Sequence, residues 1–82
     1  MNKATIFETI TRIICEVIPE LEGHAFQPDD RLVDLGANSI DRAEIVTMTL
    51  EALSLSIPRV ELSEAKNVGD LARIIYEKSQ AV

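Results

Sequence analysis

Apolar residues near the start of the chain recur at helical spacing. Between Thr5 and Ile18 they predict one amphipathic helix, because side chains three or four positions apart share a helix face. The residues of this stripe are Ile6, Ile10, Ile13, Ile14 and Val17. Thr5 and Glu8 fit a capping box at the start of the helix, with Asn2 as an alternative N-cap. Pro19 ends the helix.

The following segment, residues 19–38, has the composition of a loop. Pro19, Gly23, Pro28 and Gly36 are turn and loop residues. Because a loop of this length is uncommon inside a compact domain, we expect apolar side chains within it to contact the helices. These side chains are Leu21, Phe26, Leu32, Val33 and Leu35. The loop is therefore predicted to be long but held against the bundle.

A second helix is predicted from Asn38 or Ser39 to about Leu53. Asn38 is a favourable N-cap residue, and Asp41 places a carboxylate beside the exposed amides of the first turn. The residues expected to face inward are Ala43, Val46, Leu50 and Leu53. The loop after this helix closes at Ile57-Pro58.

The rest of the chain predicts one short and one longer helix. Residues Glu61 to Ala65 fit a turn or two of helix, and Asn67 with Asp70 caps a last helix. The inward residues of that helix are Leu71, Ile74 and Ile75. No segment shows convincing strand alternation. We therefore expect one all-α domain over residues 1–82, a small bundle of three main helices plus one short helix, with a long loop between the first and second helices.

Charge narrows the range of partners. Fourteen acidic and 8 basic side chains give a net charge of −6, which argues against nucleic acid and anionic membranes as partners. A basic protein surface would complement this charge, although solubility alone explains it equally well. No apolar run approaches the ~20 residues of a membrane span, and no signal peptide follows Met1. We expect a mature, complete, monomeric and cytoplasmic protein.

The sequence offers no constellation for catalysis or metal binding. Cys15 is the only cysteine and is expected to pack as a small hydrophobe, and His24 is expected to be a solvated loop residue. One cysteine and one histidine do not make a zinc site, and the EF-hand spacing is missing around Asp29, Asp30 and Asp34. We therefore expect neither an enzyme nor a metalloprotein.

The start of the second helix is the candidate site. Gly36 allows a sharp entry, Asn38 caps the helix, and Ser39 lies in the first turn, where unpaired amides and the helix dipole favour an anion. A phosphate esterified to Ser39 would be stabilised there by roughly 0.3–1 kcal/mol. On these residues alone, Ser39 is better explained as an ordinary first-turn serine, because such residues are common at helix starts.

A family resemblance changes that interpretation. The run Leu35-Gly36-Ala37-Asn38-Ser39-Ile40-Asp41 resembles the Leu-Gly-x-Asp-Ser-Leu-Asp-type signature of acyl carrier proteins, and the helices and loops around it match over nearly all 82 residues. The resemblance implies that Ser39 bears a covalent 4'-phosphopantetheine arm. It also implies loading by a phosphopantetheinyl transferase and charging by an acyltransferase.

Two residues depart from the usual pattern of the family. Asn38 stands where most members have Asp, and Arg42 adds a positive charge to a helix that is usually acidic. An Asn-Ser-Ile-Asp-Arg run is similar to the free-standing carriers of polyketide β-branching cassettes. That resemblance implies malonyl or acetyl cargo, a decarboxylating ketosynthase-like enzyme and a hydroxymethylglutaryl-synthase-like enzyme as partners. The residues expected to contact partners are Ile40, Asp41, Arg42, Ala43, Glu44, Thr47 and Glu64, with Glu51 as a further charge contact.

Other functions remain open at the level of sequence. A fatty-acid carrier shares the signature, whereas a peptidyl carrier usually has Gly-Gly-x-Ser, which Ala37-Asn38-Ser39 does not match. A D-alanyl carrier fits the Gly36-Ala37 context less well. A helical interaction module without a prosthetic group is the alternative from a different functional class.

Overall fold

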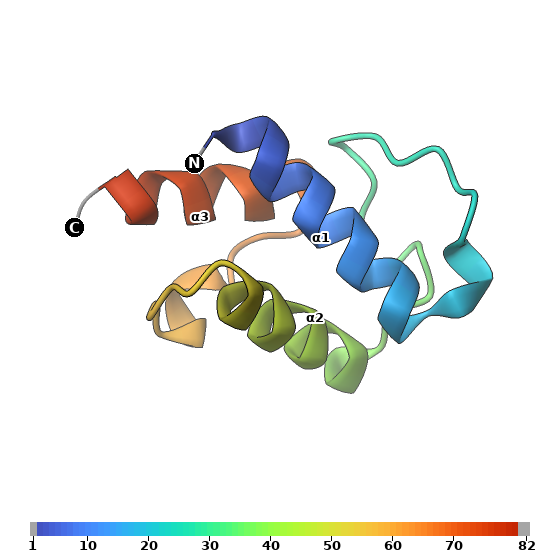
Figure 1. The fold of residues 1–82 in the computed structure, drawn as a ribbon. Helices are drawn as coiled ribbons and strands as arrows, with labels where there is room; N and C mark the ends of the chain where they lie inside the picture. Colours follow the sequence, from blue (N-terminus) through green and yellow to red (C-terminus); the bar gives the residue numbers. More distant parts are fainter. Residues whose placement is uncertain (1, 81–82) are drawn as a thin grey trace.

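The computed structural model describes residues 2–80, which form three α-helices and two short 3-10 helices (Figure 1). In chain order these elements are α1 (Lys3–Val17), η1 (Pro19–Leu21), α2 (Ser39–Ala52), η2 (Arg59–Leu62) and α3 (Val68–Gln80). No strand occurs among the described residues. The predicted all-α bundle with a long first connection is confirmed.

Helix α1 starts earlier than the stripe of apolar residues suggested. The Asn2 side chain accepts a hydrogen bond from the Thr5 amide at 2.8 Å, so Asn2 is the N-cap and the predicted Thr5–Glu8 capping box is wrong. Four isoleucines of the predicted stripe are buried, and Val17 is half-buried. The buried isoleucines are Ile6, Ile10, Ile13 and Ile14. Pro19 does end α1, but it also starts the unpredicted helix η1.

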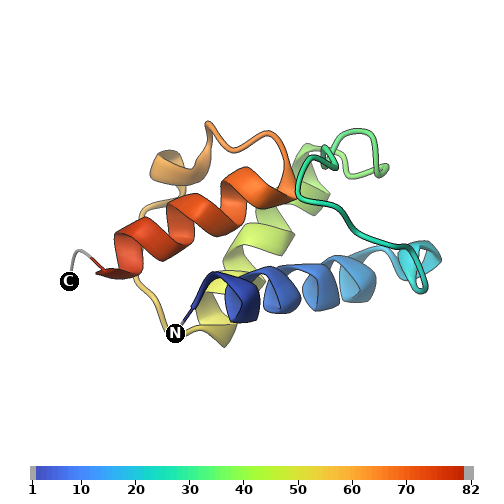
Figure 2. The same ribbon diagram turned by 90° about the horizontal axis from the view of Figure 1, so that it is seen from above.

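The three α-helices share one aliphatic core centred on α1. Helix α1 packs against both α2 and α3, whereas no close backbone approach joins α2 to α3 within residues 2–80 (Figures 1 and 2). Helix η2 contacts both α2 and α3 and covers the gap between them, and its own Leu62 side chain is buried. Lys78 Nζ of α3 donates to Glu61 Oε1 of η2 at 2.6 Å, and this ion pair raises the pKa of Lys78.

The most buried side of helix α2 is shifted from the predicted one, although the predicted residues Val46, Leu50 and Leu53 do pack against the core. Ile45 and Thr49 are fully buried, and Leu50 is buried as expected. The other predicted inward residues, Ala43, Val46 and Leu53, are only half-buried. The reason is that α1 packs against one side of α2, while the side bearing Ala43 and Val46 lines the hollow between α2 and η2. The Thr49 hydroxyl has no hydrogen-bond partner among the described residues.

The long loop turns back on itself before α2. Leu32 is buried, and Leu21, Phe26 and Leu35 are half-buried, as predicted. Val33 is 51% exposed, so its predicted place in the core is wrong. The amides of residues 34–37 donate to carbonyls three to five positions earlier, which directs Leu32 and Leu35 inward and leaves Val33 outside.

Two polar contacts hold the loop locally. The Asp30 carboxylate accepts from the Gln27 amide at 2.9 Å and lies 3.0 Å from His24 Nε2. These two hydrogen bonds lower the pKa of Asp30, and the bond from the Gln27 amide has the larger effect. His24 also packs edge-on against Phe26, so it is an ordered part of the loop. Cys15 is half-buried, with Sγ 3.6 Å from the Leu21 carbonyl.

The same loop is fastened to the start of α3 (Figure 2). The Gly69 amide donates to the Pro28 carbonyl at 2.7 Å, and the Val68 amide donates to the Asp30 carbonyl at 2.9 Å. A Cβ at Gly69 would lie 2.8 Å from that Pro28 oxygen, closer than real Cβ atoms approach. The Asn67 side chain accepts from the Asp70 amide at 2.6 Å, which confirms the predicted cap of α3. Leu71 and Ile75 are buried, and Ile74 is half-buried.

We predict that Gly69→Ala destabilises the protein by about 1–3 kcal/mol, because the new methyl group must displace Pro28. In an ordinary helix the same change stabilises by roughly 0.5–1 kcal/mol. The free energy of unfolding in urea measures the effect. A variant more stable than the wild type would show that Pro28 of the loop does not pack closely against Gly69 of α3.

Candidate functional site

The start of α2 is built by a reciprocal pair of hydrogen bonds. The Asn38 side chain accepts from the Asp41 amide at 2.8 Å, and the Asp41 carboxylate accepts from the Asn38 amide at 3.2 Å. Gly36 has φ +92°, a conformation that favours glycine, and Ala37 is buried against the core. The predicted cap is confirmed, and the sharp turn before it fixes the direction of the helix.

Ser39 is the first residue of this helix and is exposed. Its hydroxyl forms no hydrogen bond with any described residue, so the oxygen is available to an enzyme that modifies it. The capping box uses the amide at the third helical position, and the first amides of a helix have no intrahelical partner. A phosphate ester on Ser39 therefore fits the geometry and the polarity of this position.

A shallow groove runs along the outer face of α2 from Ser39. We call it the outer groove; its lining residues are Ser39, Ile40, Ala43, Glu44, Thr47, Met48 and Arg59. Ile40 is 70% exposed, and Glu44 and Thr47 are exposed as well. These three predicted contact residues thus lie beside Ser39 on the surface.

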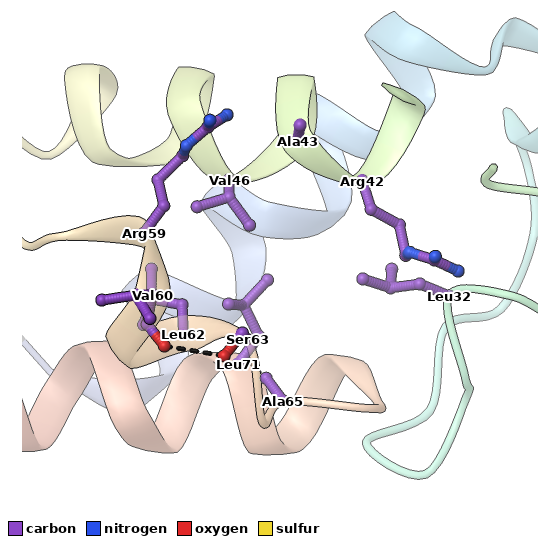
Figure 3. A pocket seen from close by; sticks show the side chains of 10 residues that line it. All are labelled: Leu32, Arg42, Ala43, Val46, Arg59, Val60, Leu62, Ser63, Ala65 and Leu71. Carbon is purple, nitrogen blue, oxygen red and sulfur yellow. Dashed lines mark hydrogen bonds between the residues drawn. The ribbon is translucent and has the colours of Figure 1, made fainter. Parts of the chain in front are cut away.

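A second, more enclosed hollow of about 340 Å³ lies between α2 and η2 (Figure 3). We call it the α2–η2 cleft. Its apolar walls are formed by Leu32, Ala43, Val46, Val60, Leu62 and Leu71, and Arg42 and Arg59 come from its two sides. Ala43 and Arg59 line both hollows, so the outer groove and the cleft adjoin each other.

The other predicted contact residues differ in their surroundings. Arg42 and Ala43, both expected to contact partners, are half-buried and line the α2–η2 cleft, and Ala43 lines the outer groove as well. Arg42 Nη1 donates to the Ala37 carbonyl at 3.4 Å. Asp41 is half-buried in the cap, and Glu64 is exposed in the turn after η2. Glu51 is exposed near the other end of α2, in a hollow next to α1.

Sequence reasoning missed Arg59, Val60 and Met48. Val60 is 75% exposed on η2, and Met48 is half-buried in the outer groove. Arg59 follows Pro58 and carries no motif, and its place in the outer groove depends on how η2 crosses the gap between the helices. The sequence offered one weak signal, which is that Val60 is an apolar residue between the charged Arg59 and Glu61.

Comparisons with known proteins bear directly on this geometry. Residues 8–75 match the family model described as a phosphopantetheine attachment site. The chain belongs to the acyl carrier protein family. Members of this family hold 4'-phosphopantetheine covalently, so the predicted cofactor is confirmed.

Two individual relatives give the comparison more detail. The chain is 60% identical over 81 residues to the polyketide biosynthesis acyl-carrier-protein AcpK of Bacillus subtilis, covering 99% of each chain. It is 30% identical over 77 residues to an acyl carrier protein of Helicobacter pylori, covering 93% of this chain and 97% of the other.

A solved structure is similar as well. It is the crystal structure of the curacin biosynthetic pathway HMG synthase in complex with acetyl donor-ACP. The TM-score is 0.88 at 45% identity, covering 92% of this chain and 96% of the other. Within residues 2–80, no helix is long and apolar enough to cross a membrane, and no group of His, Cys, Asp and Glu side chains could hold a metal ion.

We predict that Asn38→Ala destabilises the protein by about 1 kcal/mol, because the Asp41 amide loses its acceptor. Asn38→Asp should keep the stability, since its carboxylate accepts the same hydrogen bond and favours the positive end of the helix. Urea unfolding of the two variants measures the difference. Equal losses in both variants would contradict the capping role.

Proposed function

We propose that this carrier bears its 4'-phosphopantetheine arm on Ser39 and presents acetyl groups, formed from malonyl groups, to a hydroxymethylglutaryl-synthase-like enzyme of polyketide β-branching. The observation that carries the proposal is the likeness over nearly the whole chain to a carrier described as the acetyl donor in complex with an HMG synthase. The 60% identity to a polyketide biosynthesis carrier supports the same pathway class.

The chain's own residues fit the carrier role rather than a catalytic one. The exposed, unbonded hydroxyl of Ser39 supports attachment of the arm there. Once attached, the arm supplies a thiol that holds the acyl group as a thioester. The protein's contribution is to position that thioester and to contact each enzyme in turn, which favours small and transient interfaces. We also propose that the carrier is cytoplasmic and monomeric and is not itself an enzyme.

The surface around Ser39 supplies the proposed contacts. Ile40 offers an exposed apolar side chain, Glu44 and Glu64 offer carboxylates, and Thr47 offers a hydroxyl. Arg42 and Ala43 would contact partners at the edge of the α2–η2 cleft, while Asp41 acts mainly through the cap. The proposed partners are a phosphopantetheinyl transferase, an acyltransferase, a decarboxylating ketosynthase-like enzyme and the synthase.

We predict that coenzyme A and a broad-specificity phosphopantetheinyl transferase add one phosphopantetheinyl group to the protein. Intact mass measures the gain. Ser39→Ala should gain nothing, whereas Ser56→Ala, which removes another exposed serine, should be modified like the wild type. An unchanged wild-type mass would instead favour an interaction module without a prosthetic group.

We predict that Arg42→Glu lowers the kcat/KM of acetyl transfer to a cassette synthase by about tenfold or more, because the guanidinium donors at the contact are replaced by a carboxylate that only accepts hydrogen bonds. Arg42 makes one long hydrogen bond and no ion pair within residues 2–80, so most of its donors remain for a partner. Arg31→Glu makes the same charge change on the loop and should have little effect. Intact mass verifies equal acetyl loading in both variants. Equal rates in all three proteins would exclude Arg42 from the contact.

A further inference from the structure

We propose that the α2–η2 cleft selects acyl groups that end in a carboxylate, such as malonyl, and that Arg59 binds this carboxylate. The inference rests on the proposed function, since the acyl group reaches the cleft on the arm at Ser39. It goes further by naming the chemical class that the cleft retains and the residue that recognises it.

The first argument is the continuity between Ser39 and the cleft. Ser39 and Arg59 line the outer groove together, although they are far apart in sequence. Arg59 and Ala43 then line the α2–η2 cleft as well. An arm that starts at Ser39 and follows the outer groove over Ala43 can therefore reach both Arg59 and the cleft, because Ala43 and Arg59 line both hollows. Figure 3 shows Ala43 and Arg59 at the cleft.

The second argument is the chemistry of the lining. The interior of the cleft is formed by Val46, Leu62 and Leu71, which suits the methylene and methyl groups of the arm. These apolar side chains provide no partner for a carboxylate, and burying an unpaired charge there is unfavourable. Two arginines line the cleft, and Arg42 already donates to the Ala37 carbonyl, whereas Arg59 makes no side-chain hydrogen bond with residues 2–80. The guanidinium of Arg59 supplies up to two parallel N–H donors, the arrangement that suits a carboxylate best.

The third argument is that Arg59 is not used elsewhere. The ion pairs among residues 2–80 involve Arg31, Arg73, Lys78 and His24, and Arg59 takes part in none of them and in no side-chain hydrogen bond. The nearest acidic residue in sequence on η2, Glu61, is held by Lys78. The same ion pair fastens η2 to α3 and so limits the movement of the segment that carries Arg59.

The fourth argument is that Arg59 is positively charged whereas the protein as a whole is negatively charged. A net charge of −6 repels a carboxylate over most of the surface, so a local cation is needed to hold one near the protein. Acetyl has no carboxylate and gains nothing from Arg59. Loss of CO₂ from the malonyl group would thus remove the contact and free the arm for the next enzyme.

The test compares the protein loaded with malonyl and with acetyl groups, with loading verified by intact mass. Cleavage of each thioester by hydroxylamine is normalised to the same acyl group on coenzyme A, which cancels its intrinsic reactivity. The malonyl form should be protected about two- to fivefold more than the acetyl form, as for a partly exposed ion pair. High salt should reduce this difference.

Two variants separate Arg59 from a general charge effect. Arg59→Gln should abolish the malonyl protection and leave the acetyl form unchanged, whereas Arg31→Gln, an equal charge change outside the cleft, should keep it. Amide ¹H–¹⁵N shifts of Val46 and Ala65 should differ between the malonyl and acetyl forms only while Arg59 is present. Equal protection of both acyl groups, or protection that survives in Arg59→Gln, would overturn the inference while leaving the carrier function intact. Failure to load any arm would overturn both.

Discussion

The buried isoleucine face of α1 is the contact on which the other elements depend. Ile6, Ile10, Ile13 and Ile14 lie at the centre of an aliphatic core that has no tryptophan, and they meet both α2 and α3. In a domain this small, one helix must serve two neighbours, because there are too few residues for a separate interface between each pair. The consequence is that α2 and α3 are held at α1 and not directly by each other.

This arrangement leaves a hollow between α2 and η2. The gap between α2 and α3 is covered by η2, whose Leu62 is buried and whose Glu61 is paired with Lys78. A short 3-10 helix has few hydrogen bonds of its own, so its position comes from these tertiary contacts. The hollow that remains beneath η2 is apolar inside and has arginines at its sides. The long loop adds the remaining wall through Leu32, and its bonds to the start of α3 keep that wall in place.

The attachment region and the cleft are stabilised by independent interactions. The start of α2 depends on the reciprocal Asn38–Asp41 hydrogen bonds, which are local in sequence. The cleft depends on η2, which lies a full helix further along the chain. Ser39 can therefore remain exposed while the neighbouring hollow keeps its shape. The substitution of Asn for the usual acidic residue keeps the cap and removes one negative charge beside the arm.

The sequence by itself determined most of what depends on neighbours within a turn or two of helix, although it favoured a cap at Thr5 where the structure has Asn2. The isoleucine stripe, the caps at Asn38 and Asn67 and the family signature around Ser39 were all readable, because helical spacing and capping are local. What failed required knowledge of which elements meet: the buried face of α2 with Ile45 and Thr49, and the outward turn of Val33. Arg59 belongs to the same class, since nothing local places it in the groove that Ser39 also lines. Only the tertiary structure decided these features, because burial of a side chain depends on packing against residues distant in sequence.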